Sequence, residues 1–136
     1  IGFGVKNYFE VFDSKEYGNE QNFEYIDDEI HIASHIEPLS KDLLDKLKEK
    51  YNYYESYSKI VNDSYLANHC SNCKVIQGDF FLFEDVDTPF FVDSIEKAKG
   101  LKLYKVPLEN DLIVDLDVGF GSEDYLIEKY AQKFNF

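Results

Sequence analysis

The chain has 136 residues, and its 27 Asp and Glu residues outnumber its 14 Lys and Arg residues, which gives a formal net charge of −13 at pH 7. Proteins bind a phosphate backbone with cations that displace its counterions, so this composition excludes nucleic acid as a direct partner and disfavours an anionic membrane face. The length fits a single domain over residues 1–136, and the 11 Tyr and 12 Phe provide large side chains for a core. No apolar run approaches the roughly eighteen residues of a membrane helix.

The cysteines and the start of the chain give two further expectations. The only two cysteines lie three positions apart, which argues against a secreted disulfide scaffold and favours a cytoplasmic location. The chain opens on Ile1 and contains no Met, so we expect either a processed start or a fragment of a longer protein. The acidity either attracts a basic protein partner or serves solubility alone.

The first third of the chain predicts two strands with a loop between them. Alternate apolar residues over 1–12 predict the first strand. Residues 13–28 are mostly polar and are expected to form a loop or an irregular excursion. Over 29–36, Ile30 and Ile32 belong to an apolar face of period two, which predicts the second strand.

A helix is predicted over residues 40–51. Ser40 is placed to accept a first-turn amide as the N-cap. Leu43, Leu47 and Tyr51 then recur at helical spacing and form one apolar stripe.

The remaining elements are expected to be short and joined by turns. They are strands over 53–61 and 65–70, a short helix over 94–99, paired strands over 101–108 and 111–118, and a closing helix after Ser122 with Leu126, Tyr130 and Phe134 as its core stripe. The sum is an α+β fold with a mostly antiparallel sheet, two main helices and a zinc-knuckle-like turn.

That turn is Cys70-x-x-Cys73, the most specific chemical feature of the sequence. Two intervening residues let the chain fold back so that both thiolates bind one zinc ion, but a structural site needs four ligands. An inert buried pair and a redox dithiol are the alternatives. The redox interpretation is the weakest, because residues 74–78 predict no long helix to follow the thiol.

The three histidines are poor candidates for the missing zinc ligands. His31 and His35 would lie about 13 Å apart in a strand, which is too far for one ion. His69 precedes Cys70 directly and would point to the other face of a strand. We expect all three to be hydrogen-bonded histidines on the surface or at a sheet edge.

The segment 68–73, Asn-His-Cys-Ser-Asn-Cys, followed by Gln-Gly-Asp-Phe-Phe-Leu over 77–82, resembles a largely uncharacterised family of bacterial proteins. Its members carry an H-C-x-x-C-G-x-x-Q-G-D-F-F-L segment with a C-W-K-C knuckle far upstream. The similarity extends to 57–59 and 89–91 and, more weakly, to 121–124. It implies a zinc-ribbon-like element and no established activity.

The sequence departs from that family at two points. Lys74 stands where the family usually has Gly, so the turn after the second cysteine is expected to be strained or differently shaped. The upstream C-x-x-C is absent, although it would fall just before a strand like the one that begins at Ile1. Our hypothesis is that this chain has lost, or never had, the second half of a four-cysteine site.

Clustered carboxylates offer weaker alternatives. Glu84, Asp85 and Asp87 lack the spacing of a calcium loop and are expected to form a solvated acidic turn. The aspartates at 111, 115 and 117 share one parity, which predicts the solvent face of a strand rather than catalytic carboxylates. The Gly-Phe-Gly segment over 119–121 lacks the Lys of a phosphate loop.

The sequence therefore favours a cytoplasmic bacterial protein-interaction or regulatory module in which Cys70 and Cys73 give half of a zinc site. The rival from another class is a metal- or carboxylate-dependent enzyme that uses the region from Asp79 to Asp87. An acidic mimic that occupies a nucleic-acid-binding protein is the third hypothesis.

Overall fold

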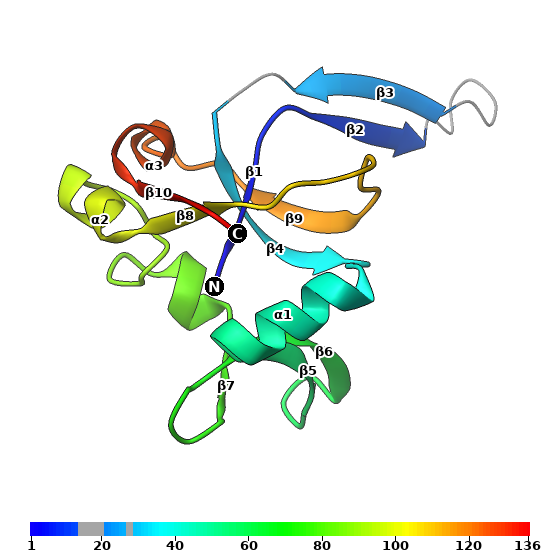
Figure 1. Ribbon diagram of the computed structural model, residues 1–136, viewed down its shortest axis with the longest axis vertical. Helices are drawn as coiled ribbons and strands as arrows, with labels where there is room; N and C mark the ends of the chain where they lie inside the picture. The colour runs from blue at the N-terminus through cyan, green and yellow to red at the C-terminus, as the bar shows by residue number, and fades with distance from the viewer. Residues whose placement is uncertain (14–20, 27–28) are drawn as a thin grey trace.

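The computed structural model describes residues 1–13, 21–26 and 29–136. Within these ranges the strands are mostly antiparallel and the helices are short, so the expected α+β class is confirmed (Figure 1). The elements are β1 (Phe3–Val5), β2 (Tyr8–Asp13), β3 (Gln21–Ile26), β4 (His31–Glu37), α1 (Lys41–Tyr51), β5 (Tyr53–Ser58), β6 (Asp63–His69), β7 (Ile76–Gln77), the π-helix η1 (Phe80–Glu84), α2 (Ile95–Gly100), β8 (Lys102–Lys105), β9 (Asp115–Gly119), α3 (Tyr125–Tyr130) and β10 (Gln132–Asn135).

One half of the molecule is built on the antiparallel sheet β1–β4–β9, beside which β8 and β10 form a parallel pair. Helices α2 and α3 lie together at one side of this half (Figure 1). Apolar side chains in these helices and just beside them form the main buried cluster of the described chain, which consists of Val92, Ala98, Leu126, Ile127 and Ala131.

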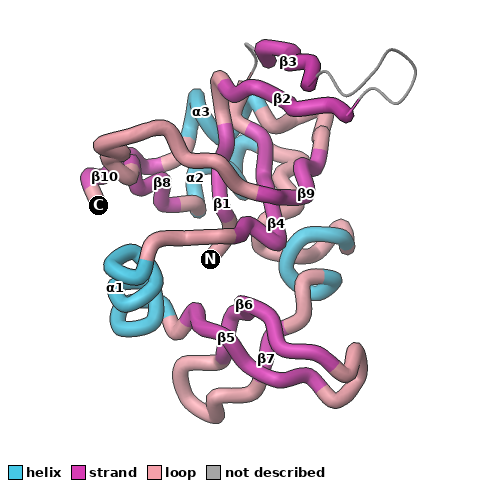
Figure 2. Tube along the Cα trace, turned by 90° about the vertical axis from the view of Figure 1, so that its right-hand side faces the viewer, coloured by secondary structure: helices cyan, strands magenta, loops and turns pink. Residues whose placement is uncertain are grey.

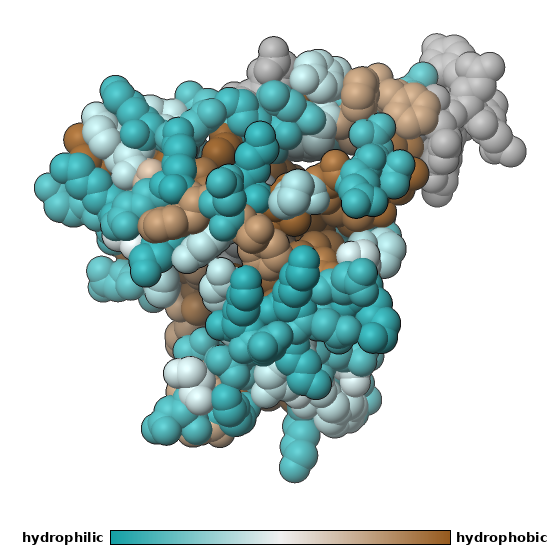
Figure 3. Space-filling model, in the orientation of Figure 1, coloured by the Kyte–Doolittle hydropathy of each residue, from teal (hydrophilic) through white to brown (hydrophobic). Residues whose placement is uncertain are grey.

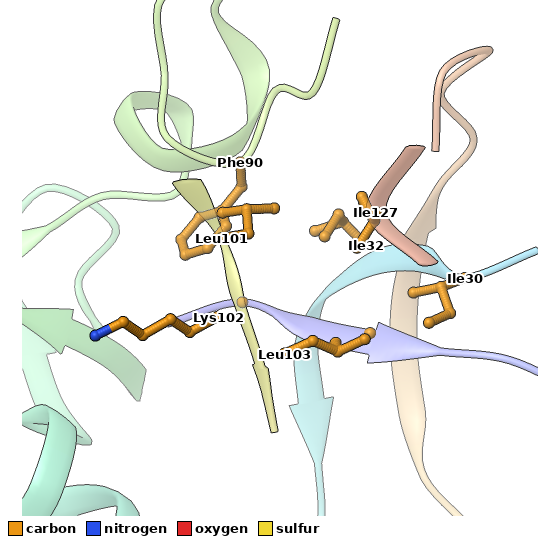
Figure 4. Close-up of a pocket in the computed structure, with 9 residues that line it drawn as sticks. Ile30, Ile32, Phe90, Leu101, Lys102, Leu103 and Ile127 are labelled. Carbon is orange, nitrogen blue, oxygen red and sulfur yellow. The ribbon is translucent and has the colours of Figure 1, made fainter. Parts of the chain in front are cut away.

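Strand β1 passes this core closely because it carries Gly4, with Gly2 just before it. Figure 4 shows Ile32, Leu101 and Ile127 around a cavity of about 50 Å³, while Lys102 extends away from it. A Cβ atom on Gly4, which also lines the cavity, would lie 3.0 Å from the Ile30 side chain. The missing side chain of Gly4 therefore allows β1 to approach its neighbours closely.

The other half contains α1, the sheet β5–β6–β7 and η1 (Figure 2). Helix α1 begins as predicted, because the Ser40 hydroxyl accepts the Leu43 N–H at 3.4 Å. It ends at Asn52, whose left-handed backbone turns the chain directly into β5. Tyr53, 4% exposed, then packs edge-to-face against Phe3 of β1 and ties the two halves together.

Two predictions for the first third of the chain are wrong in part. The single strand over 1–12 is two strands, β1 and β2, because Asn7 adopts a left-handed conformation with φ 55° and redirects the chain. The loop over 13–28 contains β3, whose alternating Phe23 and Tyr25 pair with β2. The rest of that predicted loop, 14–20 and 27–28, lies outside the described residues. The strand predicted over 29–36 is confirmed as β4.

The pairing predicted for the later strands is also wrong. Residues 101–108 and 111–118 do not pair with each other; β8 pairs with β10, and β9 pairs with β4. The closing helix is only α3, which follows Asp124 rather than Ser122, and its predicted core residue Phe134 lies in β10 and is 42% exposed. The pairing of these strands depends on partners that are far apart in the sequence. Local sequence patterns therefore do not predict which strands pair. The short helix predicted over 94–99 is confirmed as α2, with Ser94 as its N-cap.

No helix in the described ranges is long and apolar enough to cross a membrane.

Candidate metal centre

The two cysteines lie in the connection between β6 and β7, which pair antiparallel. The Cys70 N–H donates to the Val75 carbonyl at 3.0 Å, and the Lys74 N–H donates to the Cys70 carbonyl at 3.0 Å. These two bonds close the connection into a tight turn with Cys73 inside it. We call residues 70–75 the cysteine turn.

Lys74 keeps the backbone shape that a glycine would favour at this position. Its φ is 60°, in the left-handed region. The Lys74 ammonium donates to the Asn52 side-chain carbonyl at 2.7 Å, which anchors the turn to the end of α1. Lys74 therefore accepts the conformational strain that we expected from the missing glycine, and the turn stays closed.

Hydrogen bonds in the turn favour a thiolate at Cys70. The nearby backbone N–H groups of Cys73 and Asn72, then the Cys73 thiol and the Lys74 charge, lower the pKa of Cys70 below its ordinary value. As residues, Cys70 is partly exposed and Cys73 is exposed. A thiolate stabilised by backbone amides is the form that binds zinc.

The ligand set at the turn is nevertheless incomplete within this chain. In the described part of the chain, no group of three or more His, Cys, Asp or Glu side chains is arranged to hold a metal ion. Cys70 and Cys73 are therefore two potential ligands, fewer than the four that a structural zinc site needs.

His31 is buried in β4. Its Nδ1 lies 2.9 Å from a carboxylate oxygen of Asp124, and that oxygen also accepts the Gly121 N–H at 3.0 Å. The ring packs on Phe120 with 4.7 Å between centroids. His31 therefore connects β4 to the start of α3, and the prediction of a surface or edge histidine is wrong here.

His35 is the exposed histidine that was predicted, but it occupies a site that sequence reasoning missed. Its Nε2 lies 3.0 Å from Asp79 and its Nδ1 lies 3.0 Å from Asp117. The pairing of β4 with β9 is interrupted between Ser34 and Glu37, and His35 within that interval has φ 51°. The bulge turns the ring toward carboxylates from both halves of the molecule.

His69 is also buried, again contrary to the prediction. Its ring stacks on Tyr54 with centroids 3.7 Å apart, and its Nδ1 lies 3.2 Å from the Asn52 carbonyl. Through these contacts His69, the residue just before the cysteine turn, helps to hold the turn in place.

Asn68 is a structural residue that sequence reasoning also missed. The Ile1 backbone nitrogen donates to its side-chain carbonyl, and its side-chain amide donates to the Ile1 carbonyl at 2.9 Å. The Asn68 side chain thereby forms hydrogen bonds with the Ile1 backbone like those that a paired strand would form. A buried Asn within a strand is unfavourable without such bonds.

The carboxylate at Asp79 is half-enclosed. Desolvation raises its pKa above the ordinary value, against the opposing effect of His35. The cavity that it lines with Tyr53 and Asn68 has a volume of about 10 Å³, room for about one water molecule.

The weaker carboxylate candidates lie on the surface. Asp85 accepts the Val86 N–H at 2.8 Å and so shapes its own turn, and Glu84 and Asp87 are exposed beside it. Asp115 and Asp117 lie on the exposed face of β9, as predicted. Asp111 precedes that strand.

In comparisons with known proteins, the chain matches no family model, no curated protein and no solved structure.

Proposed function

We propose that the chain is a zinc-ribbon-like protein-interaction or regulatory module that works in the cytoplasm. Cys70 and Cys73 give two ligands of a structural zinc ion, and the remaining two come from a further segment of the gene product or from a second copy of the chain. The ion would hold the cysteine turn rigid and fasten it to the element that supplies the other ligands.

The observation that carries the proposal is the closed backbone of the cysteine turn, in which the Cys70 N–H donates to the Val75 carbonyl and the Lys74 N–H donates to the Cys70 carbonyl, both at 3.0 Å, so that both cysteines lie in one short turn. An inert buried pair has no need of accessible sulfurs, yet Cys73 is exposed. A redox dithiol is favoured at the N-terminus of a helix, whereas this turn connects two strands. Structural metal binding is the use that fits both the accessibility and the location.

The enzyme hypothesis gains little from the geometry. His35 between Asp79 and Asp117 resembles an acid–base arrangement. The adjoining cavity of about 10 Å³ is far below the several hundred Å³ of an ordinary substrate pocket. We therefore interpret this cluster as a link between the two halves of the molecule.

Native mass spectrometry with metal analysis of the intact gene product tests the proposal. One zinc per chain, or one per two chains, is expected. Replacement of Cys70 by Ser should abolish zinc binding, and Ser71→Ala, inside the same turn, should leave it unchanged. A metal-free and stably folded gene product would contradict the proposal.

A pull-down with a salt titration distinguishes the binding hypotheses. Salt-insensitive capture of a partner fits an ordinary protein interface. Capture of a nucleic-acid-binding protein that is lost as salt rises would favour the acidic mimic instead.

A further inference from the structure

The hairpin β2–β3 exposes its apolar face. Phe9 pairs with Tyr25 and Val11 pairs with Phe23 on one face of the hairpin. The phenylalanines are 63% exposed, and Val11 and Tyr25 are each 51% exposed. The rings of Phe9 and Tyr25 lie 4.9 Å apart and form the centre of an apolar patch. Figure 3 shows tan and brown residues on this part of the molecule, above the mostly teal surface of α1.

The opposite face of the same hairpin carries two glutamates among other residues. It pairs Glu10 with Glu24 and Tyr8 with Ile26. Glu10, Tyr8 and Ile26 are partly buried, whereas all four residues of the apolar patch are exposed. A shift of one residue in a strand exchanges its two faces, so this register directs the apolar side chains outward. A hairpin that served only the internal core would have the opposite orientation.

Strand β3 also presents an edge to which no strand of the described residues pairs. In the described ranges β3 pairs only with β2, and both views show β3 outermost with β2 between it and the body (Figures 1 and 2). Its sequence, Gln-Asn-Phe-Glu-Tyr-Ile, contains neither the Lys nor the Pro that commonly protects an exposed edge. The edge is therefore a template for a further strand.

We propose that the β3 edge binds an extended, basic segment of a partner protein by strand addition. A strand added there would alternate its side chains between the two faces of the hairpin. Those on one face would cover Phe23 and Tyr25, and those on the other would lie beside Glu24. The matching partner segment alternates apolar residues with Lys or Arg.

The net charge favours such a partner over a second copy of this chain. A formal charge of −13 makes two copies repel each other and attracts a cationic segment. The inference deepens the proposed interaction role but does not depend on zinc, because the hairpin is remote in sequence from the cysteine turn.

A peptide titration followed by amide NMR tests the inference. The probe is a capped peptide of about seven residues, matching the length of β3, in which Lys alternates with Val or Phe. The control peptide has the same composition with its Lys residues at the ends and its apolar residues together. We expect the alternating peptide to bind at least about tenfold more tightly and to shift amide signals of β3.

Variants of the chain locate the binding. Phe23→Ser should weaken the alternating peptide about tenfold, and Glu24→Lys should weaken it severalfold at low salt. Ile60→Ser, at a 97% exposed apolar residue elsewhere, and Glu55→Lys, with an equal change of charge, should leave the affinity unchanged. The β3 amide signals of each free variant show whether the hairpin still forms.

Equal binding of the two peptides, or shifts confined to other strands, would overturn the inference. Dimerisation by sedimentation that Phe23→Ser abolishes would also overturn it, since the patch would then bind a second copy. Repeating the titration with Cys70→Ser separates it from the zinc proposal: retained peptide binding without metal supports the hairpin inference by itself.

Discussion

The hairpins β2–β3 and β5–β6 have backbone pairing of the same length, but their side chains differ in burial. β2–β3 and β5–β6 are both antiparallel with a continuous register. In β5–β6 the buried residues include Tyr53, Ala67 and His69, and α1 packs beside it. In β2–β3 the apolar residues Phe9 and Phe23 face solvent. Pairing of backbones is therefore the same in both hairpins, whereas burial of side chains is not.

This difference separates structural support from a docking surface. A two-stranded hairpin is only marginally stable in water without a packed face. The β5–β6 hairpin has that packing and holds the cysteine turn at its far end, next to β7. The β2–β3 hairpin leaves its apolar face available, and we assign this face to a partner.

The largest expected effect comes from truncating a buried ring in β5. Tyr53→Ala should lower the free energy of unfolding by about 3 to 5 kcal/mol, because it leaves a cavity where Tyr53 packs on Phe3. Phe23→Ala in β3 should change it by less than about 1 kcal/mol, since that ring is exposed. Urea denaturation of both variants measures the two values. Similar losses would show that β2–β3 is as much a part of the core as β5–β6.

Hydrogen exchange should rank the two hairpins in the same order. The amides of β5 and β6 should open with a free energy close to that of global unfolding. Those of β2 and β3 should open with at least about 2 kcal/mol less, because little apolar area holds the hairpin to the body. Protection of both hairpins to the same degree would remove the distinction.

A smaller effect is expected at Asp79, between the halves of the molecule. A carboxyl group with a raised folded-state pKa binds its proton more tightly when folded, so stability should rise as pH falls from that pKa toward the ordinary value near 4. Asp79→Asn should remove this pH dependence and, at pH 7, leave stability equal or higher by less than about 1 kcal/mol.

Asp117→Asn is the matched control, because Asp117 bonds the same histidine but its side chain is 78% exposed. It should change stability very little at any pH. If Asp79→Asn instead destabilises the chain at pH 7, the His35 pair outweighs the desolvation of Asp79.

The smallest expected effect is on the Cys70 thiol. Its pKa should lie below that of an ordinary cysteine, so in Cys73→Ala the rate of alkylation should reach half-maximum at a lower pH than in the urea-unfolded chain. Lys74→Gln should raise this midpoint slightly by removing a nearby positive charge. A midpoint equal to that of the unfolded chain would show that the backbone N–H groups do not stabilise the thiolate.

Elements with local signals could be predicted from the sequence. Ser40 caps its helix as expected, because capping involves residues only three positions apart. The short helix predicted over 94–99 also forms, as α2. The alternation over 29–36 correctly predicted β4. The β3 strand was missed because its short apolar pattern lies within a polar stretch, and only pairing with β2 reveals it.

In the candidate site, too, only the features with a local sequence signal could be predicted. The position of the cysteine turn followed from the spacing of Cys70 and Cys73. The burial of His31 and His69 could not be predicted, because it depends on Asp124 and Tyr54, which the fold brings from other elements. The zinc itself stays a prediction.

X-ray absorption spectroscopy of the zinc-loaded gene product tests the central claim most directly, because it identifies the atoms bound to the metal. Sulfur ligands at about 2.3 Å are expected, and Cys70→Ser should reduce their number while Ser71→Ala does not. A zinc ion surrounded only by nitrogen and oxygen at about 2.0–2.2 Å, and unaffected by Cys70→Ser, would contradict the assignment of Cys70 and Cys73 as metal ligands.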